Sequence, residues 1–279
     1  ARSSISMTFA ASARAKWSSL TAANSVAGVA GGLVALGVKK TNLFIRDSIA
    51  ELKGRVEIDI EGNTFDDIVG NTTFKNVFYT NQKKEFSFKE FNVPSSLKDS
   101  IKRIDVSSKD IANGYITGNF TFSELFKVAQ NALGSIYTNY QPYKVAPNQF
   151  LNFNFTVYNQ IVNVFFPEIS IDDKTKIQGK IKSNKNQLKL TFSSPRIDAY
   201  GNEVKDVLLR TDNQNPLYNS HLTASEVNTK YYNISKFNIL NLTQNDTLFF
   251  KSIFNGGKKK NENFNLDFYY TFNPESKSV

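Results

Sequence analysis

Residues that could do chemistry are few in this chain, and they are scattered. A catalytic triad or a metal site needs histidine, cysteine or several convergent carboxylates. The chain has a single histidine, His221, and no cysteine. Its acidic pairs, Asp66-Asp67 and Asp172-Asp173, stand beside turns. Neighbouring residues on an extended strand point to opposite faces, so neither pair suits acid–base catalysis on one substrate.

The sequence therefore predicts a protein that is not an enzyme. We expect His221 to be a surface or strand histidine whose replacement leaves function unchanged. No glycine-rich phosphate loop, zinc-ligand spacing or calcium-loop pattern occurs, and we expect neither a cofactor nor a bound metal. The zero cysteine count also excludes a disulfide framework.

The chain is basic, with a formal net charge of +9 and a pI near 9.4. Such a balance is compatible with a nucleic-acid or anionic-membrane partner. The lysines, however, are spread along polar strand faces and turns, and the only dense run is the lysine triplet 258–260. We interpret the triplet as a solvated hairpin tip, with a lipid-headgroup contact as the alternative, and expect no nucleic-acid partner.

The elements that must carry any function are strands in which apolar and polar residues alternate. The clearest segments are 151–157, 162–166, 188–192 and 264–272. Alternation places the apolar and aromatic residues on one face, and Asn, Lys and Thr on the other. The chain has 24 Phe and 12 Tyr but one Trp and one Met, which suits pleated surfaces better than helical cores.

Further strands are predicted in the first half of the chain. They are residues 56–60, 68–79, 86–91, 101–106 and 115–122. Pro94 is expected to close the third of them. A weak repeat places a glycine inside or next to strands, at Gly54, Gly70, Gly118 and Gly179. A glycine in a strand marks a bulge, a bend or a close approach of another group.

One amphipathic helix is predicted at residues 123–137. Ser123 is placed to cap its start and Gly134 to end it in a left-handed turn. Its apolar face is formed by Leu125, Ala129, Ala132, Leu133 and Ile136. We expect this helix to cover one end or edge of the sheet, since uncovered edges aggregate. A gate or a partner-docking helix is the alternative.

The chain divides into four segments on this interpretation. They are an Ala/Gly-rich strand and loop segment at 1–36, a first groove segment at 37–122, the helical insertion at 123–137, and a second groove segment at 138–279 that is continuous with the first. Within the N-terminal part, residues 22–38 are too short and too rich in Gly, Ala and Ser to span a membrane well.

These strands predict an all-β fold made of an elongated, curved, mostly antiparallel sheet with one short amphipathic helix. About fifteen strands at 4.7–4.9 Å spacing give a sheet roughly 70 Å wide, which must curl, close or fold over. Curled into a half-pipe, its apolar side becomes a groove. Burying an acyl chain of about 16 carbons there is worth on the order of 10 kcal/mol, at about 0.8 kcal/mol per methylene.

The candidate groove residues are the apolar members of the alternating segments. They are Leu151, Phe153, Phe155, Val157, Val162, Val164, Phe166, Leu188, Leu190, Phe192, Phe264, Leu266, Phe268, Tyr270 and Phe272.

Five short runs resemble one known family. They are residues 52–62, 131–140, 212–218, 229–232 and 245–251. These runs, together with the alternation of apolar and polar residues in the strands, are similar to the TamB (translocation and assembly module) proteins of Bacteroidota. Those proteins belong to the AsmA-like, DUF490-type envelope group. The resemblance covers residues 37–272 and is strongest after Phe120.

The resemblance implies a β-taco protein of the periplasm of a Gram-negative cell envelope, anchored in the inner membrane by a helix outside this chain. It implies lipid transport, in which the groove shields phospholipid acyl chains between the inner and outer membranes. It also implies an outer-membrane partner of the Omp85/TamA class and a place in outer-membrane biogenesis. No catalytic residues come with this family.

Three other functions remain compatible with the alternating pattern. An assembly scaffold would hold nascent outer-membrane strands by adding them to its sheet edges. A transmembrane β-barrel also alternates in segments of about ten residues, but the charged turns here favour no consistent side. A carbohydrate-binding or adhesin sheet is disfavoured by the shortage of Trp for stacking on sugars.

Overall fold

The computed structural model describes residues 3–13, 50–62, 64, 66–81, 84–137, 140–244, 247–257 and 261–271. Three expectations from the sequence fall outside these residues. They concern the small-residue stretch 22–38, the lysine triplet 258–260 and Phe272.

Strands make up most of the described chain. They are β1 (Ser3–Ala13), β2 (Ala50–Glu61), β3 (Val69–Asn81), β4 (Glu85–Phe88), β5 (Phe91–Lys98), β6 (Ile101–Ser107), β7 (Ala112–Asn119), β8 (Phe150–Val157), β9 (Ile169–Ile171), β10 (Lys176–Lys182), β11 (Gln187–Ala199), β12 (Asn202–Asp212), β13 (Ser220–Asn228), β14 (Asn233–Gln244), β15 (Thr247–Gly256) and β16 (Glu262–Thr271). The helices are α2 (Leu125–Gly134), α3 (Asn159–Phe165) and the short 3₁₀ turn η1 (Asn184–Asn186).

The strands form one large open sheet whose order follows the chain. The order is β1-β2-β3-β5-β6-β7-β8-β10-β11-β12-β13-β14-β15-β16, with β4 beside β3 and β9 beside β11. Neighbouring strands pair antiparallel, as in β10 with β8 and β15 with β16. The prediction of an all-β fold built on a mostly antiparallel sheet is confirmed, and segments 151–157, 188–192 and 264–271 lie in strands β8, β11 and β16.

The fourth alternating segment, 162–166, is not a strand. Its residues lie in or directly after α3, so the prediction of a single helix is also wrong. Val164 of α3 is buried against Val77, Tyr79 and Phe88. A run this short fits a helix or a strand equally well by its pattern, and only these packing contacts decide between them.

Both predicted caps of α2 are wrong as well. The N-cap is Glu124, one residue after Ser123, and no side-chain cap hydrogen bond forms there. The Glu124 carboxylate instead accepts hydrogen bonds from Gln149 Nε2 (2.7 Å) and the Ala146 backbone N–H (2.9 Å). Gly134 stays helical, and Ser135 after it keeps right-handed angles. A side chain at Gly134 would overlap the Tyr140 ring, so packing and not a turn requires glycine here.

Irregularities in the first strands follow from glycine and proline. The register of β2 against β3 shifts between Lys53 and Arg55, where two β3 residues, Asn76 and Val77, lie opposite Gly54. A bulge was one of the alternatives that the sequence left open for this glycine. Gly70 has φ +138°, and a Cβ there would overlap the backbone carbonyl of Asp59 on the neighbouring strand. Pro94 does not end a strand. It lies inside β5 opposite Asn71 of β3, between the β5–β6 pairs at Asn92 and Ser95.

The chain separates into two compact units. The first contains residues 1–115 and 160–167, and the second contains 116–159 and 168–279. In the first unit, Val77, Tyr79, Phe88 and Val164 form a buried cluster, and the ring of Phe74 stacks on Phe91 at 4.8 Å between centroids. A smaller cluster there contains Val56 and Ile58.

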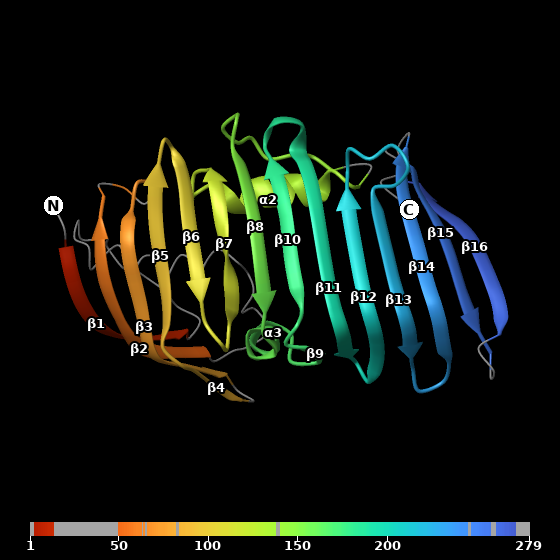
Figure 1. Ribbon diagram of the computed structural model, residues 1–279, viewed down its shortest axis with the longest axis horizontal. Coiled ribbons are helices and arrows are strands. Elements are labelled where there is room, and N and C mark those ends of the chain that lie inside the picture. The colour runs from red at the N-terminus through yellow and green to blue at the C-terminus, as the bar shows by residue number, and fades with distance from the viewer. Residues whose placement is uncertain are drawn as a thin grey trace. The chain divides into compact units, whose positions relative to one another are not determined.

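In the second unit, α2 packs against β10 and β11 (Figure 1). Its buried positions are Val128, Asn131, Ala132 and Gly134, whereas Leu133 of the predicted apolar face is half exposed. Asn131 is 2% exposed and holds the segment that follows the helix. Its Nδ2 donates to the Tyr143 carbonyl (2.8 Å), and its Oδ1 accepts from Tyr143 N–H (2.8 Å) and Tyr140 O–H (3.0 Å).

Replacing Asn131 tests this anchor. We expect Asn131→Ala to lower the free energy of unfolding by about 2–3 kcal/mol, because it removes three hydrogen bonds made by a buried side chain and leaves a small void beside α2. The exposed neighbour Lys127 is the control, and Lys127→Ala is expected to change stability by less than about 0.5 kcal/mol. Urea unfolding of both variants measures this, and equal effects would contradict the assigned role.

Candidate functional site

The register of the second unit aligns apolar residues from strand to strand. Phe155 of β8 pairs with Ile177 of β10, which pairs with Phe192 of β11. The same line continues through β12 to β16. Its members are Phe155, Ile177, Phe192, Leu209, Leu222, Ile239, Ser252 and Leu266, which we call the apolar row.

A second line of paired residues runs beside the apolar row on the same face, two residues along each strand. It consists of Phe153, Gly179, Leu190, Thr211, Ser220, Asn241, Phe250 and Phe268. This line is apolar at both ends and polar in the middle, so we call it the mixed row. A third line, Leu151, Ile181 and Leu188, lies beyond the mixed row on β8, β10 and β11. The three lines together form the apolar face.

The segment after α2 lies on this face. By alternation, Asn213 extends the side of Thr211, and Thr243 extends the side of Asn241. Asn213 Nδ2 donates to Ser135 Oγ at 2.6 Å, and Thr243 Oγ1 donates to the Ile136 carbonyl at 2.6 Å. Because Ser135 and Ile136 directly follow α2, which packs on β10 and β11, the helix covers the end of the apolar face at Leu151, Ile181 and Leu188.

The large apolar side chains of this face are more exposed far from the helix, whereas its polar members Thr211, Asn241 and Ser252 stay buried at 4–6% exposed. Leu188 is 1% exposed, whereas Phe155 and Phe192 are half-buried. At β16, Leu266 and Phe268 are each 47% exposed. Stacked rings continue to this edge, with Phe250 on Phe268 at 4.9 Å and Phe254 on Phe264 at 5.0 Å. The face is therefore closed core under α2 and an accessible surface toward β16.

The predicted groove residues separate into three groups. Those of β8, β11 and β16 share the apolar side of the second unit, and they are Leu151, Phe153, Phe155, Val157, Leu188, Leu190, Phe192, Phe264, Leu266, Phe268 and Tyr270. Val162, Val164 and Phe166 belong to α3 or follow it, and Val164 packs in the cluster of the first unit. Phe272 lies beyond the described residues.

Sequence reasoning missed the members of the face that β10 and β12–β15 supply. They are Ile177, Ile181, Leu209, Leu222, Ile239 and Phe250. The same alternation was available in β10, where Gly179 interrupts the apolar series between Ile177 and Ile181. In β12 to β14 polar residues occupy both faces, so the pattern alone gives no clear assignment.

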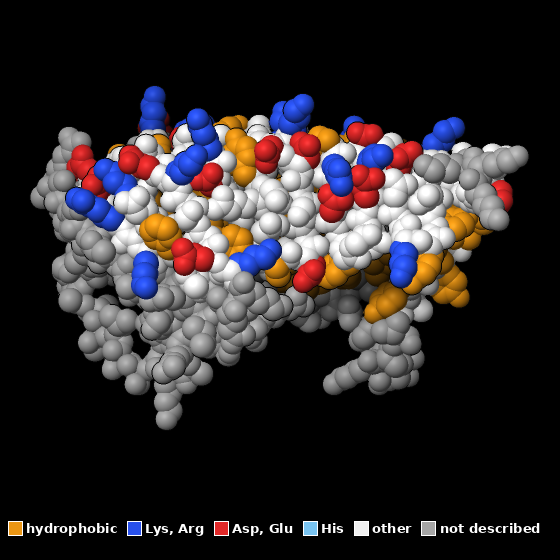
Figure 2. All heavy atoms as spheres, turned by 90° about the horizontal axis from the view of Figure 1, so that it is seen from below, with side chains coloured by type: hydrophobic (Ala, Val, Ile, Leu, Met, Phe, Trp, Pro, Cys, Tyr) orange, Lys and Arg blue, Asp and Glu red, His pale blue; other side chains and the backbone are white. Residues whose placement is uncertain are grey.

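Charged side chains of the second unit pair with one another. Arg196 contacts Asp198 (2.9 Å) and Glu203 (3.1 Å), and Lys205 contacts Glu226 (3.1 Å). The hydrogen bond to Glu226 is the main reason that the pKa of Lys205 is raised. In Figure 2, charged side chains gather along the upper side of the view and hydrophobic ones toward the lower right.

Asp66, Asp67, Asp172 and His221, which the sequence analysis considered for catalysis, make ion-pair, turn and ring contacts within the fold. Asp66 pairs with Lys102 at 2.6 Å, Asp67 accepts from the Thr64 backbone N–H, and Asp172 accepts from that of Lys174. His221 lies in strand β13 and its ring packs edge-on against Tyr218. Within the described ranges, no group of three or more His, Cys, Asp or Glu is placed to hold a metal ion.

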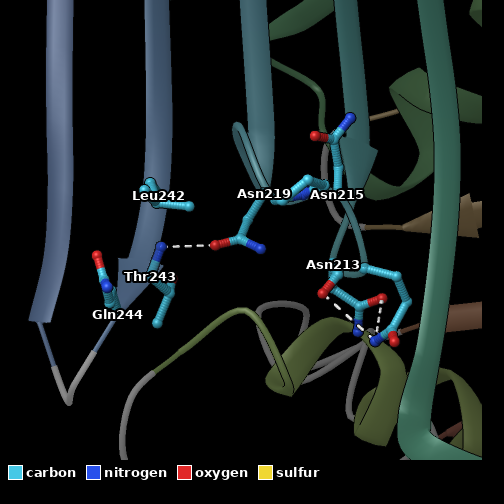
Figure 3. Close-up of a pocket in the computed structure, with 8 residues that line it drawn as sticks. Asn213, Asn215, Asn219, Leu242, Thr243 and Gln244 are labelled. Atoms are coloured by element: carbon cyan, nitrogen blue, oxygen red, sulfur yellow. Dashed lines mark hydrogen bonds between the residues drawn. The ribbon is translucent and has the colours of Figure 1, made fainter.

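A polar hollow of about 400 Å³ opens where β12 and β14 meet the loop before β13 (Figure 3). It is lined mainly by carboxamides, from Asn213, Gln214, Asn215, Asn219 and Gln244. Asn219 is 8% exposed, and its Oδ1 accepts the Thr243 backbone N–H at 2.5 Å.

Comparisons with known proteins do not assign this fold to a family. Scans against family models, curated proteins and solved structures each found no match. Among the described residues, no helix has both the length and the apolar character needed to cross a membrane.

The change from closed core to accessible surface can be measured by truncation. Leu188→Ala is expected to lower the free energy of unfolding by about 2–5 kcal/mol, because it leaves a cavity under α2. Phe268→Ala is expected to cost only about 1 kcal/mol, mostly its stacking on Phe250. Denaturant unfolding of both variants tests this, and a large loss at Phe268 would mean that the β16 end is also sealed.

Proposed function

We propose that this chain is a non-catalytic lipid-binding protein whose apolar face shields acyl chains from water. The observation that carries the proposal is the apolar row, which crosses eight strands in register. α2 does not cover this row, and its apolar side chains are half-buried or exposed. A continuous apolar surface of this kind, rimmed by polar residues, is typical of an interaction site.

The dimensions of the row suit an acyl chain. Eight strands at about 4.8 Å spacing give it a length of about 34 Å. The hydrocarbon core of a bilayer is about 30 Å thick and holds two opposed acyl chains, so one chain needs about half of the row. At about 0.8 kcal/mol per buried methylene, contact with even half of a 16-carbon chain is worth about 6 kcal/mol.

The sequence resemblance to TamB supports a specific setting for this activity. In that setting the chain is a periplasmic segment of an envelope-spanning groove that carries phospholipids between the inner and outer membranes. An Omp85/TamA-class protein would be its outer-membrane partner. This part of the proposal rests on the short runs of sequence named above.

A scaffold for outer-membrane protein assembly is a second candidate, and β16 favours it. Leu266, Phe268, Tyr269 and Tyr270 of this last strand are exposed on both of its faces. Exposed apolar strands at a sheet edge are templates for the addition of a further strand. On this alternative the apolar face would hold an unfolded chain in place of a lipid.

Substitutions on the two faces of the sheet test lipid binding. Phe155→Asp and Phe268→Asp are expected to abolish co-purification of phospholipid, because a carboxylate on the apolar face must lose its hydration when an acyl chain binds. Asn154→Asp, on the exposed polar face of β8, is the matched control and should retain lipid. Native mass spectrometry of protein purified without detergent, followed by lipid extraction, measures the loading.

Each outcome favours one function. Lipid that is present in the parent chain and in Asn154→Asp but lost from both Phe variants supports the proposal. Equal loading of all variants would contradict the assignment of the binding face. A lipid-free parent chain would contradict lipid binding and favour the assembly scaffold.

A further inference from the structure

The side of the second unit opposite the apolar face carries a group of exposed cations. Because side chains alternate along a strand, the residues between the members of the apolar and mixed rows point to this outer face. Five exposed basic residues lie there on β10, β11 and β12, which are neighbours in the sheet (Figure 1). They are Lys176, Lys180, Lys182, Lys189 and Arg210, which we call the basic block.

The basic block is short of carboxylates. Lys180 lies directly opposite Lys189 in the β10–β11 register, and like charges in such a cross-strand pair destabilise a sheet. Within the described chain, the only carboxylate that contacts the block is that of Asp212, whose Oδ2 is 3.7 Å from Lys189 Nζ. The ion pairs of Arg196 and Lys205 lie elsewhere on β11 and β12. The block therefore keeps an excess of positive charge at the surface.

Beyond β13, the same outer face becomes apolar. Leu242, Phe249 and Tyr269 are paired in register across β14, β15 and β16, and the ring centroids of Phe249 and Tyr269 are 6.5 Å apart. Leu240 and Ile253 lie beside them on the same face. Phe249, Ile253 and Tyr269 are 46%, 43% and 70% exposed. We call these five residues the outer apolar block.

Strands β15 and β16 are thus apolar on both faces. The runs 248–250 and 268–270 are continuously apolar, which is typical of strands covered on both sides. Lys251 and Asp267, the charged residues between these apolar side chains, lie directly opposite each other and carry opposite charges. The outer apolar block is therefore an exposed apolar surface with little net charge, and such surfaces mark interaction sites.

The two blocks together indicate the chemistry of the partner. Only β13 separates them, so β12 and β14 are about 10 Å apart and one broad partner can contact both blocks. A bilayer with anionic lipids offers negative headgroups to the basic block and an apolar boundary beneath them to the outer apolar block. A nucleic acid or an anionic polysaccharide would neutralise the basic block but leave the outer apolar block in water.

We propose that the outer face of the second unit docks on the surface of an anionic lipid bilayer. The basic block lies against the headgroups, and the outer apolar block enters the interfacial region. This docking goes beyond the proposed function and does not depend on it, because acyl chains are bound on the opposite side of the sheet.

Co-sedimentation with vesicles measures the docking. We expect the parent chain to bind vesicles of phosphatidylcholine mixed with phosphatidylglycerol, and to bind vesicles of phosphatidylcholine alone far more weakly. The double variant Lys180→Gln/Lys189→Gln should weaken binding to the anionic vesicles about 25-fold, at about fivefold for each basic residue removed. Because it also removes a like-charge pair, this variant should not lower Tm.

A matched control removes the same charge elsewhere in the unit. Lys127→Gln/Lys144→Gln changes two exposed lysines, on α2 and in the segment after it. It should weaken binding less than about twofold at a salt concentration where the Debye length is about 8 Å.

Two further variants separate the faces of the sheet. Phe249→Ser removes a ring from the outer apolar block and should weaken binding to the anionic vesicles about tenfold. Phe155→Asp, on the apolar face, should dock on these vesicles as the parent chain does.

Each outcome supports or overturns the docking. Losses in both the double lysine variant and Phe249→Ser, with the control unchanged, support it. Failure to bind the anionic vesicles, equal binding to both kinds of vesicle, or retained binding in either of these variants overturns it. If Phe249→Ser alone retains binding and a duplex DNA oligonucleotide displaces the vesicles, the partner is a polyanion. A parent chain that docks but carries no phospholipid contradicts acyl-chain binding alone.

Discussion

The antiparallel ladder is the constraint on which the rest of the structure depends. Each strand of the second unit pairs with the next in a register that keeps Phe155, Phe192 and Leu222 on one side. Side chains alternate with a period of two, so a slip of one residue at any hairpin would turn every later strand over. The apolar face is thus a product of many backbone registers acting together. No individual side chain creates it.

Local departures from the ladder occur where the backbone allows them. Asp206 and Lys236 adopt left-handed φ angles of 48° and 52° inside β12 and β14, and the β14–β15 register shifts between Ser235 and Asn238. The register shift at Lys236 is a bulge, and a bulge increases the local twist of a strand and bends it. It does not interrupt the apolar row, because Leu222, Ile239 and Ser252 remain paired beyond it.

Helix α2 decides how much of the apolar face is core. It is held to the strand ends by polar contacts, from Ser135 to Asn213 and from Thr243 to the Ile136 carbonyl. The helix excludes water from Leu188 and its neighbours, which supplies hydrophobic stability at one end. The remaining face keeps apolar surface accessible, and that surface is the basis of the proposed function. Stability and binding thus draw on different parts of one face.

The sequence by itself determined the strands and the side to which their apolar residues point. Strict alternation in 151–157 and 188–192 specifies both, because the pleat of an extended chain leaves no other arrangement. It also marked Gly54 as an irregular position, without deciding between a bulge, a bend and a close approach, and the β2–β3 register shifts there. Alternation over only 162–166 was too short to specify a strand, and α3 forms there because Val164 packs against Val77 and Phe88.

Only the tertiary structure decided which apolar residues are covered and which polar ones converge. Leu188 and Phe268 have the same pattern in the sequence, yet one is buried under α2 and the other is half exposed at the last strand. The hollow around Asn219 combines residues from two strand ends and a loop. Nothing in the sequence indicates that these segments lie close together. Whether a side chain is buried, and which side chains come together, depends on contacts between segments that are distant in the sequence. The sequence pattern predicts which face of a strand a residue lies on, but it does not predict what packs against that face.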